Sequence, residues 1–82
     1  MGRFGAKLRF LRHQRGMTLR ELADALGFRS HGFVGDLESG RKYPSLDLAV
    51  RIADFFEVPL DRLARDELDL SDEPAAATDE TA

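Results

Sequence analysis

The chain has 82 residues, of which 43% are hydrophobic and 33% are charged, so we expect one small domain without a deep catalytic cleft. It contains no cysteine, which excludes disulfides and thiolate metal sites. No apolar run approaches the roughly 20 residues of a membrane span, and cations interrupt the N-terminus too often for a signal peptide. We therefore expect a cytoplasmic protein without a membrane partner.

Charge is distributed unevenly along the chain, within an overall net charge of −3. Residues 1–65 hold twelve Lys and Arg against eight Asp and Glu, a net charge of +4, whereas residues 66–82 hold seven acids and no cation. From residue 71 onward nothing is apolar enough to offset the entropy of ordering the chain. We expect a basic domain over residues 1–68 and an acidic, disordered tail over residues 69–82; an extra helix that packs on a partner is the alternative for the tail.

The first part of the chain predicts two helices, the first of them moderately long, and each is stopped by a glycine. Phe4, Leu8 and Leu11 lie at helical spacing in the first. In "TLRELADALG", Thr18 and Glu21 stand three residues apart and can form a capping box, in which each side chain bonds a free backbone N–H. The expected apolar face of this second helix consists of Leu19, Leu22, Ala23 and Leu26.

Three more helices are expected after these. Ser30 can cap a third helix that ends before Gly40, and Ser45 can cap a fourth. The segment "VPLDRLARDEL" predicts a short fifth helix with Pro59 in its first turn. No stretch alternates as a strand, so the expected fold class is all-α with five helices. The residues expected to face the core from the fourth helix are Leu46, Ala49, Val50, Ala53 and Phe56.

Motifs from several parts of the chain combine into one known pattern. They include "MTLRELADALG", the "ESG" that ends the third helix, and the closing "RIADFFEVPLDRL". Together they resemble the lambda-repressor-like, XRE-type (Cro/C1-type) helix-turn-helix family over residues 4–65. The resemblance implies a five-helix domain that binds double-stranded DNA and regulates transcription, in our interpretation as a repressor. It also implies a homodimer on a near-palindromic operator, associated with the bacterial nucleoid.

The third helix, residues 30–39, is the recognition helix in this resemblance and would lie in the major groove. The usual spacing would bury positions 33 and 36, but position 36 is Asp, and an unpaired buried carboxylate is too costly. Moving the apolar pair by one residue places Val34 and Leu37 inward instead. We therefore expect the turn "GFRSHG" to be one residue longer than in the family.

The expected DNA contacts lie at the starts of two helices, on the outer face of the third helix and in the loop after it. A merely solvated surface is the alternative, and the net charge of +5 over residues 1–42 favours contact. Arg9 and Arg15 can add to the same positive face. Asp36 opposes DNA binding, and we interpret it as paired internally or placed at the rim. The expected contact residues are Thr18, Arg20, Arg29, Ser30, His31, Gly32, Phe33, Gly35, Arg41 and Lys42.

The resemblance also implies two structural roles. Arg12 and Glu38 would form an ion pair that orients the recognition helix without touching DNA. A dimer surface would include the apolar residues near the fifth helix, although these can also simply pack on their neighbours. The candidates for this surface are Phe55, Leu60, Leu63 and Leu68.

Catalysis, metal binding and cofactors are not expected. The two histidines, His13 and His31, have no carboxylate at metal-site spacing, and Ser30 beside His31 lacks the third group of a catalytic triad. A different class of function stays open, in which the fold serves as a protein-interaction module, such as part of an antitoxin or a scaffold. Asp36, the glycines of the third helix and Leu19 favour that alternative with weak or absent DNA binding.

Overall fold

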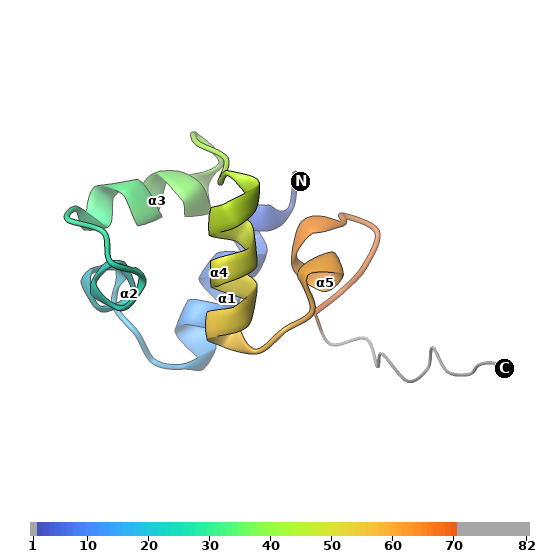
Figure 1. Cartoon of the computed structure of the whole chain (residues 1–82), viewed down its shortest axis with the longest axis horizontal. Helices are drawn as coiled ribbons and strands as arrows, with labels where there is room; N and C mark the ends of the chain where they lie inside the picture. Colours follow the sequence, from blue (N-terminus) through green and yellow to red (C-terminus); the bar gives the residue numbers. More distant parts are fainter. Residues whose placement is uncertain (1, 71–82) are drawn as a thin grey trace, which may run out of the picture.

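A computed structural model describes residues 2–70, which form five α-helices (Figure 1). No strand occurs in this part of the chain, and the expected all-α class is confirmed. The tail expected beyond residue 70 lies outside the described residues. The helices are α1 (Phe4–Gln14), α2 (Leu19–Leu26), α3 (His31–Ser39), α4 (Leu46–Phe56) and α5 (Leu60–Ala64).

Side-chain caps determine where three of these helices begin. Thr18 Oγ1 accepts a hydrogen bond from the Glu21 N–H at 3.0 Å, and Glu21 Oε1 accepts one from the Thr18 N–H at 2.8 Å. The expected capping box is therefore present at α2. The Ser30 and Ser45 hydroxyls cap α3 and α4 through bonds of 3.1 Å. Both α2 and α3 end at a glycine with a φ of 83°, a left-handed conformation.

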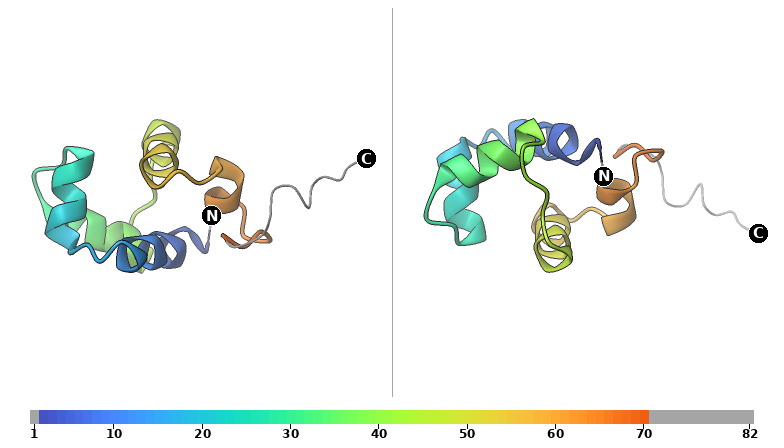
Figure 2. Two further views of the ribbon diagram at one scale, coloured as in Figure 1. Left: turned by 90° about the horizontal axis from the view of Figure 1, so that it is seen from below. Right: turned by 90° about the horizontal axis from the view of Figure 1, so that it is seen from above.

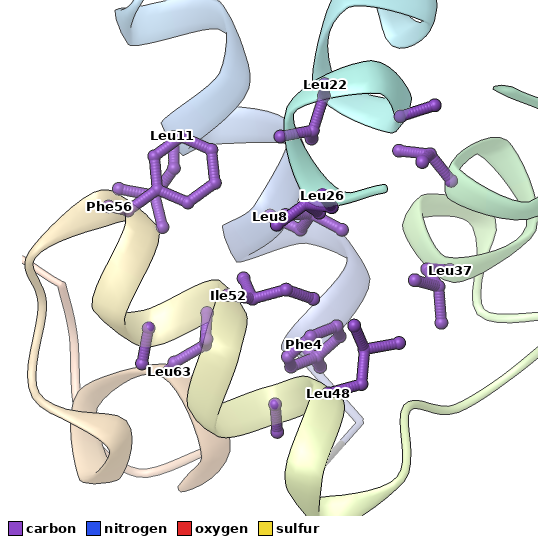
Figure 3. Close-up of a cluster of buried hydrophobic side chains, with 14 residues drawn as sticks. Phe4, Leu8, Leu11, Leu22, Leu26, Leu37, Leu48, Ile52, Phe56 and Leu63 are labelled. Atoms are coloured by element: carbon purple, nitrogen blue, oxygen red, sulfur yellow. The ribbon is translucent and has the colours of Figure 1, made fainter. Parts of the chain in front are cut away.

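α1 and α3 lie side by side on one side of the molecule, with α4 on the other and α2 and α5 toward the two ends (Figure 2). Their apolar faces meet in one core (Figure 3). Val34 and Leu37 point into it, at 0% and 1% exposure, as the shifted spacing predicts. The large side chains that are buried most completely are Phe4, Leu8, Leu22, Val34, Leu37, Ile52 and Leu63.

The face that α4 turns to the core differs from the expected one. Leu46 is 72% exposed and Val50 is 38% exposed, so the expectation that both face inward is wrong. Leu48 and Ile52 take their place, and Ile52 lies near Leu63 of α5 (Figure 3). The reason is that α4 carries apolar residues on both flanks of its central alanines. Only the positions of α1 and α5 decide which flank is covered.

α1 and α3 approach each other closely at Gly5. A Cβ atom at this position would lie 2.5 Å from the carbonyl oxygen of Leu37, and closer still to that of Glu38. Glycine is therefore the residue that allows this helix crossing. The sequence pattern did not lead us to a role for Gly5, although a glycine within the Phe4–Leu8 apolar face was a usable signal.

The segment after α5 folds back onto the start of α1 through Lys7. The Lys7 ammonium donates hydrogen bonds to the carbonyl oxygens of Arg62 at 2.7 Å, Arg65 at 2.8 Å and Leu68 at 2.7 Å. Its surroundings lower the pKa of Lys7, mainly because burial penalises the charged form. α5 ends early, at Ala64, and this lysine satisfies carbonyl groups that a longer helix would have bonded internally.

Asp66, which follows α5, also contacts the start of α1. α1 has no side-chain cap of its own, and the Asp66 carboxylate accepts hydrogen bonds from the N–H groups of Gly2 and Arg3, both at 2.9 Å. The bond from Arg3 is the main cause that lowers the pKa of Asp66. Asp69 also pairs with the Arg3 guanidinium at 2.9 Å, and Leu70 packs against the core. Contacts with the rest of the domain thus continue to Leu70 within the described residues, and the domain boundary expected at residue 68 stays a prediction.

Candidate nucleic-acid interface

α2 and α3 are joined by a four-residue turn, residues 27–30, that is supported from two sides. The rings of Phe28 and Phe33 pack edge to face, with centroids 4.9 Å apart. Arg51 reaches across from α4 and donates a hydrogen bond of 2.5 Å to the Leu26 carbonyl at the end of α2. These contacts hold α3 along one edge of the molecule, with its outer face uncovered in the described structure (Figure 1).

The C-terminal end of α3 is attached to α1 by the expected ion pair between Arg12 and Glu38. Arg12 Nε lies 2.6 Å from Glu38 Oε2, and Arg12 Nη2 lies 3.1 Å from Glu38 Oε1. Arg12 also donates to the Met17 carbonyl at 2.8 Å, so it joins α1, the following turn and α3. The hydrogen bond with Glu38 raises the pKa of Arg12. Arg9 adds a second contact to Glu38 at 3.2 Å, which we did not predict from the sequence.

The expected DNA contacts on α3 fall into two groups. His31 and Gly32 are exposed, next to the Ser30 cap. Phe33 and Gly35 are half-buried and take part in packing: Phe33 lies against Phe28, and Gly35 faces α2. A Cβ atom added at Gly35 would lie 3.9 Å from Leu19 Cδ1, an ordinary contact distance. The structure therefore brings the start of α3 to the surface and uses its middle partly for packing.

Asp36 has the internal partner that we expected for it. Its Oδ2 lies 3.8 Å from Lys42 Nζ, and their side chains are 32% and 58% exposed. The same ammonium lies 5.6 Å from the centroid of the Phe33 ring. Lys42 thus folds back from the loop onto the outer face of α3, where it offsets the charge of Asp36.

Most of the cations in the described chain have a partner within the protein. They hold the fold together through ion pairs, hydrogen bonds to carbonyl groups or contacts with aromatic rings, and they include Arg9 and Arg15, which the sequence suggested for a positive binding face. These engaged cations, apart from Lys42, are Arg3, Lys7, Arg9, Arg12, Arg15, Arg51, Arg62 and Arg65.

Three cations within residues 2–70 have no such partner: Arg20, Arg29 and Arg41. All three are exposed, and they belong to α2, the turn and the loop after α3. Their guanidinium groups are therefore available to an external anion. The sequence could not separate these three arginines from the others, because the separation depends on which carbonyl and carboxylate groups the fold brings within reach.

Thr18, one of the expected DNA contacts, is the N-cap residue of α2. Its hydroxyl oxygen accepts the Glu21 N–H, while the backbone N–H groups of Leu19 and Arg20 have no acceptor within the described helix. Such a helix start can bind a phosphate through its free N–H groups. Leu19 itself is half-buried against the core, which explains an apolar residue at this position.

The candidate dimer surface is largely used by the core. Leu63 is 0% exposed, so its assignment to a dimer surface is wrong: α5 turns this side chain inward against α4. Phe55, Leu60 and Leu68 are half-buried, and the Arg15 guanidinium lies over the Phe55 ring at 5.1 Å. The large apolar side chains that are exposed in the described chain are Phe10, Tyr43, Leu46 and Val50.

A five-helix fold in which α2 and α3 are linked by a short turn, with α3 at the surface, defines a helix-turn-helix protein. The sequence model of the helix-turn-helix domain matches residues 3–68, and the chain belongs to this family. The match confirms the family resemblance and is consistent with its XRE-like form. Domains of this kind are DNA-binding modules and are typically non-enzymatic. Comparison with curated proteins and with solved structures found no match.

Two further findings concern only the residues that the structure describes. No group of three or more His, Asp or Glu side chains is arranged to hold a metal ion. None of the helices is long and apolar enough to cross a membrane.

Proposed function

We propose that this protein is a sequence-specific DNA-binding regulator of transcription, with α3 lying in the major groove. The distribution of cations carries the proposal. Arginines elsewhere in the described fold are engaged internally, whereas Arg20, Arg29 and Arg41 around the helix-turn-helix are not. Phosphate contacts from such residues position a protein on the duplex, and the exposed start of α3 then meets the base edges. His31 and Ser30 are the polar side chains at that start.

We further propose that it acts as a homodimer on a near-palindromic operator and represses transcription by blocking the polymerase. Two recognition helices would then contact half-sites about 34 Å apart. Tyr43 and Leu46, which are 64% and 72% exposed, offer apolar surface for pairing in place of the buried Leu63. Phe55, Leu60 and Leu68 can contribute only their exposed parts.

The test is binding of the full chain to a random-sequence DNA pool at several salt concentrations, followed by sequencing of the bound fraction. We expect enrichment of a near-palindrome. Replacing Arg20, Arg29 and Arg41 by Gln should weaken binding and flatten its salt dependence, by about 0.9 in the logarithmic slope for each phosphate that is no longer neutralised. Each of the three single Arg→Gln variants is matched by Arg65→Gln, which removes the same charge, because Arg65 is exposed but pairs with Glu67 at 3.1 Å.

The two possible results have different meanings. Weaker binding by each single variant and normal binding by Arg65→Gln would support the assignment of the three arginines. Equal binding by each single variant and by Arg65→Gln would contradict it, since net charge alone would then explain the affinity.

The second candidate function is a protein-interaction module of the same fold with weak DNA binding. The observation that favours it is exposed apolar surface at Phe10, which is 54% exposed and which the proposed dimer does not use. Affinity for DNA at physiological salt separates the two functions. A chain that loses all DNA binding under those conditions fits the interaction module.

A further inference from the structure

The pair formed by Asp36 and Lys42 lies on the outer face of α3, where the proposed function places DNA. The loop that carries Lys42 is anchored to the helix, because the N–H groups of Arg41 and Lys42 donate to the Asp36 carbonyl at 2.9 and 3.2 Å. The side-chain atoms Oδ2 and Nζ then stand 3.8 Å apart, with both side chains partly exposed. A carboxylate and an ammonium group are thus held next to each other and are open to solvent.

Two glycines lie close to this pair in α3. Gly32 lies one helical turn before Asp36, and Gly35 lies directly before it, so neither position carries a side chain. Both glycines lie within a helix that is capped at each end, by Ser30 and by Gly40. Since the helix is well formed, we do not attribute these glycines to fraying. Gly32 leaves the pair accessible to a surface that approaches closely, whereas Gly35 faces Leu19 of α2.

The two groups have complementary chemistry. An ionised carboxylate only accepts hydrogen bonds, and an ammonium group only donates them. In the major groove a C·G pair presents the N4 donor of cytosine beside the O6 and N7 acceptors of guanine. Because N4 and O6 are themselves hydrogen-bonded, they lie about 2.9 Å apart. An acceptor and a donor separated by 3.8 Å can therefore contact both bases of one pair.

An A·T pair fits this arrangement less well. The adenine N7 acceptor lies beside the N6 donor and repels a carboxylate, and the thymine methyl group crowds an ammonium next to O4. Cytosine presents no acceptor in the groove, and guanine offers two acceptors to the lysine. The charge of Lys42 also removes the main objection to an acid at this position, which is repulsion by the phosphates.

We propose that Asp36 and Lys42 together recognise one C·G base pair in each half-site, with Asp36 accepting from cytosine N4 and Lys42 donating to guanine. This inference rests on the proposed function, since it requires α3 to enter the major groove. It assigns a base contact to Lys42, which the sequence predicted only as a DNA-contact residue. It also makes Asp36 a determinant of specificity.

The experiment is a selection from a random DNA pool with the full chain and its Asp36→Asn and Lys42→Gln variants. For the wild type we expect a C·G pair at one fixed position of each half-site, and replacing it should lower affinity about tenfold. Both variants should lose this discrimination and keep the preferences at the other positions. The matched controls are Glu67→Gln and Arg65→Gln, which break an exposed ion pair away from α3 with the same changes in charge.

Each outcome decides one point. If both variants enrich the same base as the wild type at every position, the pair is only an internal ion pair and the inference is overturned. If the wild type enriches no sequence at all, the proposed function fails and the inference fails with it. Circular dichroism checks the fold of each variant, and because the two substitutions are independent, one folded variant suffices for the test.

Discussion

The two faces of α3 differ in their burial and in the number of ion pairs that they form with the rest of the protein. On the inner face, Glu38 is 2% exposed at its side chain and bonds to Arg12 and Arg9. On the outer face, Asp36 is 32% exposed and has one partner, Lys42, at 3.8 Å. Two acids only two positions apart therefore have different roles. The inner face fixes the orientation of the helix, and the outer face is left with a few accessible groups.

This difference explains how a short helix with two glycines can serve as a recognition element. Helix propensity would make α3 marginal, since each glycine costs about 1 kcal/mol relative to alanine in a helix interior. Its caps, the Gly5 crossing and the Glu38 ion pairs supply the stability instead. The outer face is then free to carry residues chosen for binding.

The largest effect on stability is expected from Arg12→Ala, which removes the ion pair between α1 and Glu38 of α3. The substitution leaves the buried Glu38 carboxylate with only the more exposed Arg9 as partner, so the free energy of unfolding should fall by about 3 kcal/mol. Arg9→Ala is the matched control and should cost less than about 1 kcal/mol, because Arg9 is 55% exposed. Urea unfolding measures both. Equal effects would mean that Arg12 does not dominate the attachment.

A second test compares a glycine at a close helix crossing with a glycine that has only an ordinary contact nearby. Gly5→Ala places a methyl group against the Leu37 and Glu38 carbonyls and should destabilise the fold by about 2–3 kcal/mol. Gly35→Ala meets only Leu19 at 3.9 Å and should stabilise it by up to about 1 kcal/mol. Thermal unfolding gives both values. A stabilising Gly5→Ala would show that the close crossing of α1 and α3 is absent in solution.

Gly35→Ala also tests the outer face directly. If DNA approaches the bare backbone closely, the more stable variant should bind its operator less tightly than the wild type, by about tenfold for a methyl group that clashes. Fluorescence anisotropy with a labelled operator measures this. Unchanged affinity would show that Gly35 serves the packing against Leu19 and not the approach of DNA.

The smallest effect concerns Asp66, which caps α1 and depends on pH. The hydrogen bond from Arg3 lowers its pKa below the ordinary 3.8, so the unfolded chain binds a proton at a higher pH than the folded chain. The stabilisation is therefore complete above that value and is lost as the pH falls through the folded pKa. Asp66→Asn should lower Tm modestly at neutral pH, and the difference should shrink in acid. A difference that does not change with pH would exclude this capping role.

The sequence predicted those features of the fold that depend on neighbouring residues. The Thr18–Glu21 capping box and the Ser30 cap needed only local spacing, and Val34 followed from the cost of burying Asp36. The Arg12–Glu38 pair came from the family resemblance, and the structure contains it.

Features that depend on distant segments could not be predicted in the same way. The covered flank of α4, with Ile52 in place of Val50, depends on where α1 and α5 lie. Lys7 looked like any other surface cation until the segment after α5 brought three carbonyl groups to it. The candidate site shows the same limit, because the availability of Arg29 depends on the absence of a nearby acceptor in the described fold.

The most direct test of the central claim is an NMR titration of the full ¹⁵N-labelled chain with DNA selected from the random pool, at physiological salt. If the outer face of α3 meets DNA, the largest amide shift changes will lie in residues 29–36 and 41–42, with small changes in the buried face at Leu37 and Glu38. Changes concentrated around Phe10 or around Tyr43 and Leu46, with α3 unaffected, would contradict the assignment of α3 as the recognition helix.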